Sequence, residues 1–160
     1  GIYFFEDRYD EDTVRRNFDF YEPRTVHESS LSPCIHSILA SKLGKKEKAY
    51  DLYLRTSRLD LDDYNKEVAE GLHITSMGGT WMSVVYGFAG LRIRNGQLHL
   101  NPQMPEKWTS IAFNAIFREN YLKIYLNETR LWIENEQGPE IKIVIQGKEY
   151  TIGEQSKLEI

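Results

Sequence analysis

The spacing of apolar positions changes near residue 90. Before that point, apolar residues recur every three or four positions, which is typical of amphipathic helices. After it, they alternate with polar residues in short segments such as "YLKIYL" and "IKIVIQG", separated by turns rich in Asn and Gly. We therefore predict an α+β chain. Residues 1–90 form a helical part, and residues 91–160 form a small antiparallel β-sandwich-like domain.

Local signals place the helices of the first part. Residues 10–21 begin with an acidic turn, which the helix dipole favours. In residues 32–44, Ser32 suits the N-cap, Pro33 suits the first helical position, and Gly44 suits a left-handed stop. Residues 45–59 follow at once, so the two helices are expected to be antiparallel neighbours.

A last helix is predicted over residues 76–87. It would place Trp81, Val84, Val85 and Phe88 at core spacing.

Composition limits the classes of partner. The 160 residues carry a formal net charge of −4 and show no stripe of Lys and Arg, which argues against nucleic-acid binding. No apolar run approaches the roughly 18 residues of a membrane span, and the start lacks the features of a signal peptide. The single cysteine, Cys34, has apolar neighbours and is predicted to be a buried thiol. A reducing, cytoplasmic location is therefore expected.

The segment "FYEPRTVHESSLSP", residues 20–33, is one candidate site. Glu22 precedes a proline, so we expect it to be extended and to end the preceding helix. A carboxylate beside Phe20 and Tyr21 would suit a sugar, because rings stack on its faces and its hydroxyls seek charged acceptors. The alternative is a solvated loop in which Glu22 and Glu28 are helix-end charges. A general-base pair of His27 and Glu28 is disfavoured, since adjacent loop residues usually point apart.

The segment "EGLHITSMGG", residues 70–79, is the second candidate. With Ser76 as N-cap, Gly78 and Gly79 would lie in the first helical turn, where free amides attract anions and small residues permit close approach. His73 would add a side-chain donor, and the segment would form a phosphate or sulfate site. The alternative is a plain helix cap, with glycines kept small for packing against Trp81.

Other chemistry is less well supported. The acidic segment "LDLDDYN" lacks the glycine and terminal glutamate of an EF-hand, so a structural loop is favoured. The four histidines lack zinc-binding spacing, and no nucleotide-binding loop or nucleophile elbow occurs. We therefore expect neither a metal nor a cofactor.

Three segments carry a family resemblance: "NFDFYEPRTVHESSLSPCIHSILASKLG", "RTSRLDLDDYN" and "EGLHITSMGGTWMSVVYGFAGLRI". They closely resemble the disaccharide phosphorylases of glycoside hydrolase family 65. The β half resembles the C-terminal module of that family more loosely, through "LNPQMPEKW". The resemblance implies that residues 1–90 are the last helices of an (α/α)6-barrel catalytic domain, followed by a C-terminal β-domain. The apolar start "GIYFF" also suggests the C-terminal piece of a longer protein.

The resemblance also implies a reaction. The expected activity is phosphorolysis of maltose with inversion, giving β-glucose 1-phosphate and glucose, with inorganic phosphate as co-substrate and no cofactor. Alternatives are a trehalose, kojibiose or nigerose substrate, a hydrolytic relative, or a carbohydrate-binding module without catalysis. Expected partners are the disaccharide, the rest of its own polypeptide and, as a full protein, a second copy in a homodimer.

The family pattern assigns roles to five residues. The segment matching "HITSMGG" lies at the phosphate site, which implies phosphate contacts for His73, Ser76, Gly78 and Gly79. Glu22 matches a sugar contact. No segment matches the motif of the catalytic glutamate, so that proton donor is expected upstream of residue 1.

Overall fold

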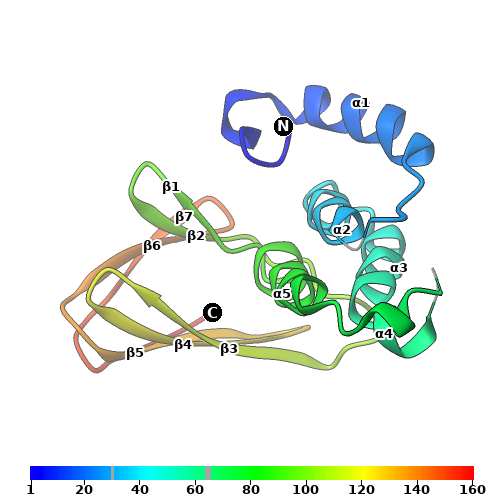
Figure 1. The fold of residues 1–160 in the computed structure, drawn as a ribbon. Helices are drawn as coiled ribbons and strands as arrows, with labels where there is room; N and C mark the ends of the chain where they lie inside the picture. The colour runs from blue at the N-terminus through cyan, green and yellow to red at the C-terminus, as the bar shows by residue number, and fades with distance from the viewer. Residues whose placement is uncertain (30, 64–65) are drawn as a thin grey trace. The chain divides into compact units, whose positions relative to one another are not determined.

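The computed structural model describes residues 1–29, 31–63 and 66–160, which form two compact units, Gly1–Phe88 and Ala89–Ile160 (Figure 1). The first unit is helical and the second consists of two small β-sheets. The α+β prediction is confirmed. Within the described ranges, no helix is both long and apolar enough to cross a membrane.

The described residues of the helical unit form five α-helices, with short 3₁₀ turns between some of them. The helices are α1 (Glu11–Tyr21), α2 (Ser32–Lys42), α3 (Lys46–Ser57), α4 (Leu59–Asp62) and α5 (Ile74–Met82). The 3₁₀ turns are η1 (Glu6–Arg8), η2 (Glu22–Arg24) and η3 (Val68–Glu70), and α5 continues as a π-helical segment, η4 (Ser83–Phe88).

Local chemistry sets the ends of α1 and α2. Asp10 caps α1 by accepting a hydrogen bond from the amide of Thr13 at 2.6 Å, followed by an acidic first turn as predicted. Gly44, at φ +72°, ends α2. Its amide bonds to Ser41 O and the amide of Lys45 to Ala40 O, which is the Schellman pattern. The left-handed stop at Gly44 is confirmed.

The predicted cap of α2 is wrong. Leu31 is the N-cap residue, and Ser32 lies inside the first turn. The Ser32 hydroxyl instead lies 2.5 Å from Nδ1 of His27. The hydroxyl that was expected to cap the helix is therefore engaged by a side chain five residues earlier.

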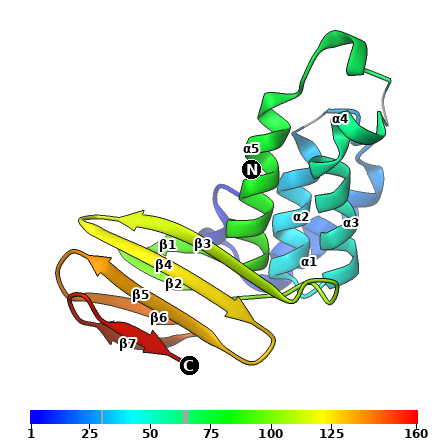
Figure 2. The same cartoon turned by 90° about the horizontal axis from the view of Figure 1, so that it is seen from below.

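Two buried serines tie α2 to its neighbours, α3 and η4, which lie beside it in Figures 1 and 2. Ser37 Oγ donates to Ala49 O at 2.8 Å, and Ser41 Oγ donates to Gly87 O at 3.0 Å. Each hydroxyl is therefore satisfied within an otherwise apolar interface. The buried apolar residues around them include Ile38, Leu39, Ala40, Leu43, Leu52, Val85 and Phe88.

The helix α5 differs from its prediction in two respects. It begins at Ile74, two residues before the predicted cap, and Ser76 is buried within its first turn. Trp81 is 50% exposed, so its assignment to the core is wrong, whereas Val85 and Phe88 are buried as predicted. The smaller residues Ser76, Gly79 and Ser83 take the inward face, which leaves Ile74, Met77 and Trp81 together on the outward face.

The β unit contains two four-stranded sheets (Figure 2). One has the order β1-β2-β6-β7, with β1 (Arg92–Arg94), β2 (Gln97–Leu100), β6 (Ile141–Ile145) and β7 (Lys148–Ile152). The other has the order β3-β4-β5-β8, with β3 (Ser110–Phe117), β4 (Asn120–Asn127), β5 (Leu131–Gln137) and β8 (Lys157–Glu159). Alternate positions are buried, as in Leu122, Ile124 and Leu126 of β4.

The sheets are not wholly antiparallel. β2 pairs with β6 in parallel, while the other strand pairs are antiparallel. The first sheet is therefore mixed, which corrects the purely antiparallel prediction. Local strand patterns cannot reveal this pairing, because the two parallel strands are separated along the chain by β3, β4 and β5 of the second sheet.

Candidate functional site

His73 is the N-cap residue of α5, and the carboxylate of Asp60 contacts both its amide and its ring. The amide of His73 donates to Oδ2 of Asp60 at 2.9 Å, and ring Nδ1 lies 2.5 Å from Oδ1 of the same residue. Asp60 belongs to the short helix α4. The hydrogen bonds from the ring and then from the amide lower the pKa of Asp60 below its ordinary value. Asp60 is therefore an ionised acceptor for both groups.

The other ring nitrogen also faces a carboxylate. Nε2 of His73 lies 3.5 Å from Oε2 of Glu67. The His73 side chain is 19% exposed, so the ring is accessible at the start of α5. Because Nδ1–H is directed at Asp60, Nε2 can donate a hydrogen bond to an anion only when the ring is protonated.

The remaining residues of this candidate site differ in their surroundings. Ser76 is buried, and its amide donates to His73 O at 2.9 Å. A Cβ added at Gly78 would meet no heavy atom within 4 Å, whereas one at Gly79 would lie 3.0 Å from Cys34 Cβ and Sγ. Gly78 therefore lies open at the surface, and Gly79 allows α5 to approach Cys34.

The early start of α5 changes which amides are free for an anion. The first-turn amides belong to residues 73–76, and three of them are already engaged: that of His73 bonds to Asp60 Oδ2, and those of Ile74 and Ser76 bond to Leu72 O and His73 O. Gly78 and Gly79 lie beyond this turn, where amides bond within the helix. The prediction of glycines in the first turn is wrong. The alternative, a packing role, applies to Gly79, but its neighbours are Cys34 and Thr56 rather than Trp81.

Glu22 is part of a compact turn. It has φ −58° and ψ −49°, so the extended conformation expected before Pro23 is wrong. The turn is fixed because the amide of Thr25 donates to Glu22 O and the Thr25 hydroxyl donates to Tyr21 O. The predicted end of α1 at this point is confirmed.

The Glu22 carboxylate is buried, at 7% exposed, and lies 2.6 Å from Nζ of Lys48 on α3. The alternative of a solvated helix-end charge is therefore wrong for this residue. A groove of about 620 Å³ lies beside it, lined by Phe18, Asp19, Glu22, Pro23, Gly44, Lys45, Lys46, Glu47 and Lys48. Phe20 and Tyr21, which were expected to flank a sugar, are exposed and absent from this lining.

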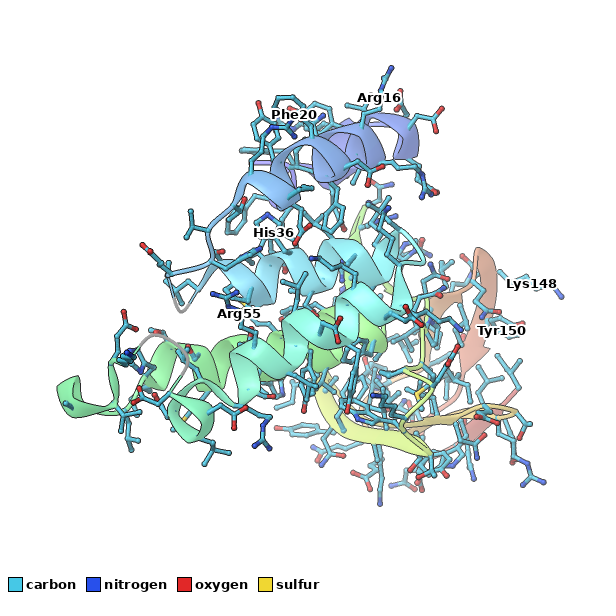
Figure 3. All side chains as sticks on the ribbon, turned by 90° about the vertical axis from the view of Figure 1, so that its right-hand side faces the viewer. Arg16, Phe20, His36, Arg55, Lys148 and Tyr150 are labelled. Atoms are coloured by element: carbon cyan, nitrogen blue, oxygen red, sulfur yellow. The ribbon has the colours of Figure 1, made fainter. Side chains whose placement is uncertain are left out.

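His27 is buried against Glu22, and the two form a cluster with Ser32, His36 and Arg55. Its Nε2 lies 3.5 Å from Oε1 of Glu22, and no hydrogen-bond partner for this atom occurs within the described ranges. The His36 ring stands perpendicular at 4.8 Å between centroids, and Arg55 donates to His27 O at 2.9 Å. In Figure 3, His36 lies on α2 where it faces α1.

The cluster favours the neutral form of His27. Burial is the main cause of its lowered pKa, followed by the nearby His36; the hydrogen-bonding influence of Glu22 opposes the shift, and Arg55 adds to it.

Glu28 is exposed while His27 is buried, in line with the expectation that adjacent loop residues point apart.

Sequence reasoning missed Asp60 and Lys48 as partners of the candidate residues. Both contacts join residues on different elements. The acidic segment containing Asp60 was weighed as a cation loop and favoured as a structural loop, and its residues 64 and 65 lie outside the described ranges. Within those ranges, no group of three or more His, Cys, Asp or Glu side chains has the arrangement of a metal site.

Comparison with known proteins identifies the class. The model of the glycosyl hydrolase family 65 central catalytic domain matches residues 1–82, and that of the family's C-terminal domain matches residues 91–152. The chain belongs to glycosyl hydrolase family 65.

The chain is similar to several curated proteins that are named as phosphorylases. The chain is 47% identical to maltose phosphorylase of Bacillus subtilis (strain 168), covering 92% of this chain and 20% of that protein. It is 39% identical to α,α-trehalose phosphorylase of Geobacillus stearothermophilus (97% and 20%) and 34% identical to kojibiose phosphorylase of Escherichia coli (strain K12) (88% and 18%).

A solved structure, a putative kojibiose phosphorylase from human microbiome, is similar with a TM-score of 0.91 and 38% identity. The match covers 99% of this chain and 23% of that one. The chain thus spans about a fifth of the length of the curated relatives it matches.

Proposed function

We propose that this chain is the C-terminal part of an inverting disaccharide phosphorylase that cleaves maltose with inorganic phosphate to β-glucose 1-phosphate and glucose. The observation that supports maltose is the identity of 47% to a maltose phosphorylase, against 39% and 34% to the trehalose and kojibiose phosphorylases named above. The latter two relatives make trehalose and kojibiose the alternative substrates, with nigerose or a hydrolytic reaction further removed.

The candidate site suits phosphate as the nucleophile. An inverting hydrolase needs a second carboxylate to activate water, whereas phosphate is already an anionic nucleophile and needs donors that hold it in line. We assign phosphate contact to His73, Ser76, Gly78 and Gly79. The accessible His73 ring at the start of α5 supports a donor role, and the open space at Gly78 supports close approach.

We assign sugar binding to Glu22. A carboxylate accepts hydrogen bonds from sugar hydroxyls, and Lys48 offsets the cost of keeping the charge buried beside the groove. The proton donor is assigned to a part of the protein outside residues 1–160. The full protein is further inferred to be a cytoplasmic homodimer that works with the rest of its own polypeptide.

The test is an assay of the full-length protein with maltose, trehalose, kojibiose and nigerose, each with and without inorganic phosphate. We expect phosphate-dependent release of β-glucose 1-phosphate, fastest with maltose. Release of glucose at the same rate without phosphate would contradict phosphorolysis. A faster reaction with another disaccharide would instead correct the substrate alone.

A further inference from the structure

The carboxylate of Asp60 contacts two groups of His73, one through each of its oxygens. One carboxylate oxygen accepts from the amide that begins α5, and the other lies against ring Nδ1. The two bonds together fix the position of the residue and the orientation of its ring. They also keep a proton on Nδ1, so Nε2, which lies 3.5 Å from Oε2 of Glu67, can donate to an anion only when the ring is protonated.

Asp60 is itself held on an ordered element. Leu59 beside it is buried, and the side chains of Arg58 and Asp62 form a paired contact along α4 at 2.7 and 2.6 Å. Asp63, in the left-handed conformation, ends the helix and accepts a hydrogen bond from the amide of Val68. The carboxylate is therefore presented from a helix whose geometry is fixed by its own contacts.

We propose that Asp60 is a positioning residue for the phosphorolysis reaction: it clamps His73 so that Nε2 is directed at inorganic phosphate. This inference rests on the proposed function, because it assumes that His73 contacts phosphate. Asp60 acts through His73 and does not itself touch the anion.

Simple electrostatics makes the opposite prediction, which gives the proposal a clear test. Asp60 is ionised, and an anion near the ring would be repelled by it. If charge alone mattered, replacing Asp60 by Asn would strengthen phosphate binding. If the clamp matters, the same change weakens it, because one amide oxygen cannot accept both bonds and the protonated ring loses its anionic partner.

The experiment uses the full-length protein and measures KM for phosphate and for the disaccharide separately. We expect Asp60→Asn to raise KM for phosphate about tenfold, the loss typical of one charge-assisted hydrogen bond, with KM for the disaccharide changed far less. Asp51→Asn is the matched control, since it makes the same change of charge at an exposed position of α3 without touching the clamp. We expect it to leave both KM values unchanged.

The variant His73→Ala tests the proposed phosphate contact of His73 separately from the positioning role of Asp60. A selective rise in KM for phosphate in this variant supports the proposed phosphate contact, and adding Asp60→Asn to it should then cause no further rise. If His73→Ala raises that KM but Asp60→Asn does not, the positioning role is wrong and the phosphate contact stands. If His73→Ala changes both KM values equally or neither, the phosphate contact is wrong and the positioning role falls with it.

A second variant guards against misfolding. Asp60→Glu keeps the charge but adds a methylene group, so it cannot maintain both bonds in the same geometry. We expect it also to raise KM for phosphate selectively, and stabilisation of each variant by inorganic phosphate alone should weaken in parallel in thermal unfolding. Wild-type affinity for phosphate in Asp60→Glu would overturn the proposal.

Discussion

His27 shows how burial can control the protonation of a histidine. It lies in the left-handed region, at φ 58°, with Nδ1 against Ser32 and Nε2 beside Glu22. Its pKa is lowered below the ordinary value of 6.5, chiefly by burial. Below that ordinary value, the unfolded chain binds a proton before the folded chain does, so acid reduces the stability of the fold.

We expect His27→Asn to make stability less sensitive to acid. Asn tolerates positive φ and does not titrate, so the variant avoids the cost of protonating a buried ring. The measurement is the thermal unfolding midpoint of the protein between about pH 7.5 and pH 5.5, the range in which histidine titrates. The fall in midpoint should be smaller in the variant than in the wild type.

A histidine outside this cluster provides the control. His99→Asn on β2 removes a histidine from a strand of the other unit and should keep the wild-type dependence on pH. An unchanged pH dependence in His27→Asn would show that its burial in the cluster does not contribute to acid sensitivity.

At the scale of elements, the adjacent glycines of α5 have opposite structural roles. Gly78 faces open space, whereas a Cβ at Gly79 would press on Cys34 at 3.0 Å and on Thr56 at 3.4 Å. Substitution of Gly78 therefore tests only the effect of glycine on helix stability. Substitution of Gly79 also tests the close contact between helices.

We expect Gly79→Ala and Gly78→Ala to change stability in opposite directions. Overpacking at Gly79 costs about 1–3 kcal/mol, against a gain in helix propensity of about 1 kcal/mol, so the net effect is destabilising. Gly78→Ala gains about 0.5–1 kcal/mol without a steric cost. Thermal unfolding of the two variants should show a lower and a higher midpoint than the wild type. Equal shifts would mean that the contact with Cys34 relaxes freely.

The same elements show which predictions a sequence supports. Asp10 and Gly44 act within a few residues of themselves, so capping and stop signals are readable directly from the chain. The start of α5 is fixed by Asp60, thirteen residues earlier, and no local rule reports such a contact. Trp81 was misplaced for a related reason: small residues, which carry a weak hydrophobic signal, took the inward face of the helix.

At the scale of the whole molecule, the chain contains segments of two family domains but only part of the length of its relatives. Both family domains are matched, yet the chain spans about a fifth of its curated relatives. The spacing of apolar residues along the sequence predicted the α+β class, but the parallel pairing of β2 with β6 depends on contacts between distant segments. The roles of Glu22 and His73 in binding come from resemblance and remain predictions.

We expect residues 1–160, produced alone, to show no phosphorolysis of maltose. The proposed phosphate and sugar contacts lie in this chain, but no segment of it matches the motif of the proton donor. The measurement is release of glucose 1-phosphate, together with calorimetric titration of maltose. A monodisperse, cooperatively folding chain that binds maltose at micromolar concentration would favour an independent carbohydrate-binding module.

The contact between Gly79 and Cys34 also gives the chain an internal reporter. The thiol is buried, its Sγ donates to Leu31 O, and burial raises its pKa, so it is a poor nucleophile while α5 lies against it. Because the thiol is buried, a thiol reagent reaches it only after the packing around Cys34 opens locally. The rate at which Cys34 is alkylated would therefore time this local opening in the native protein.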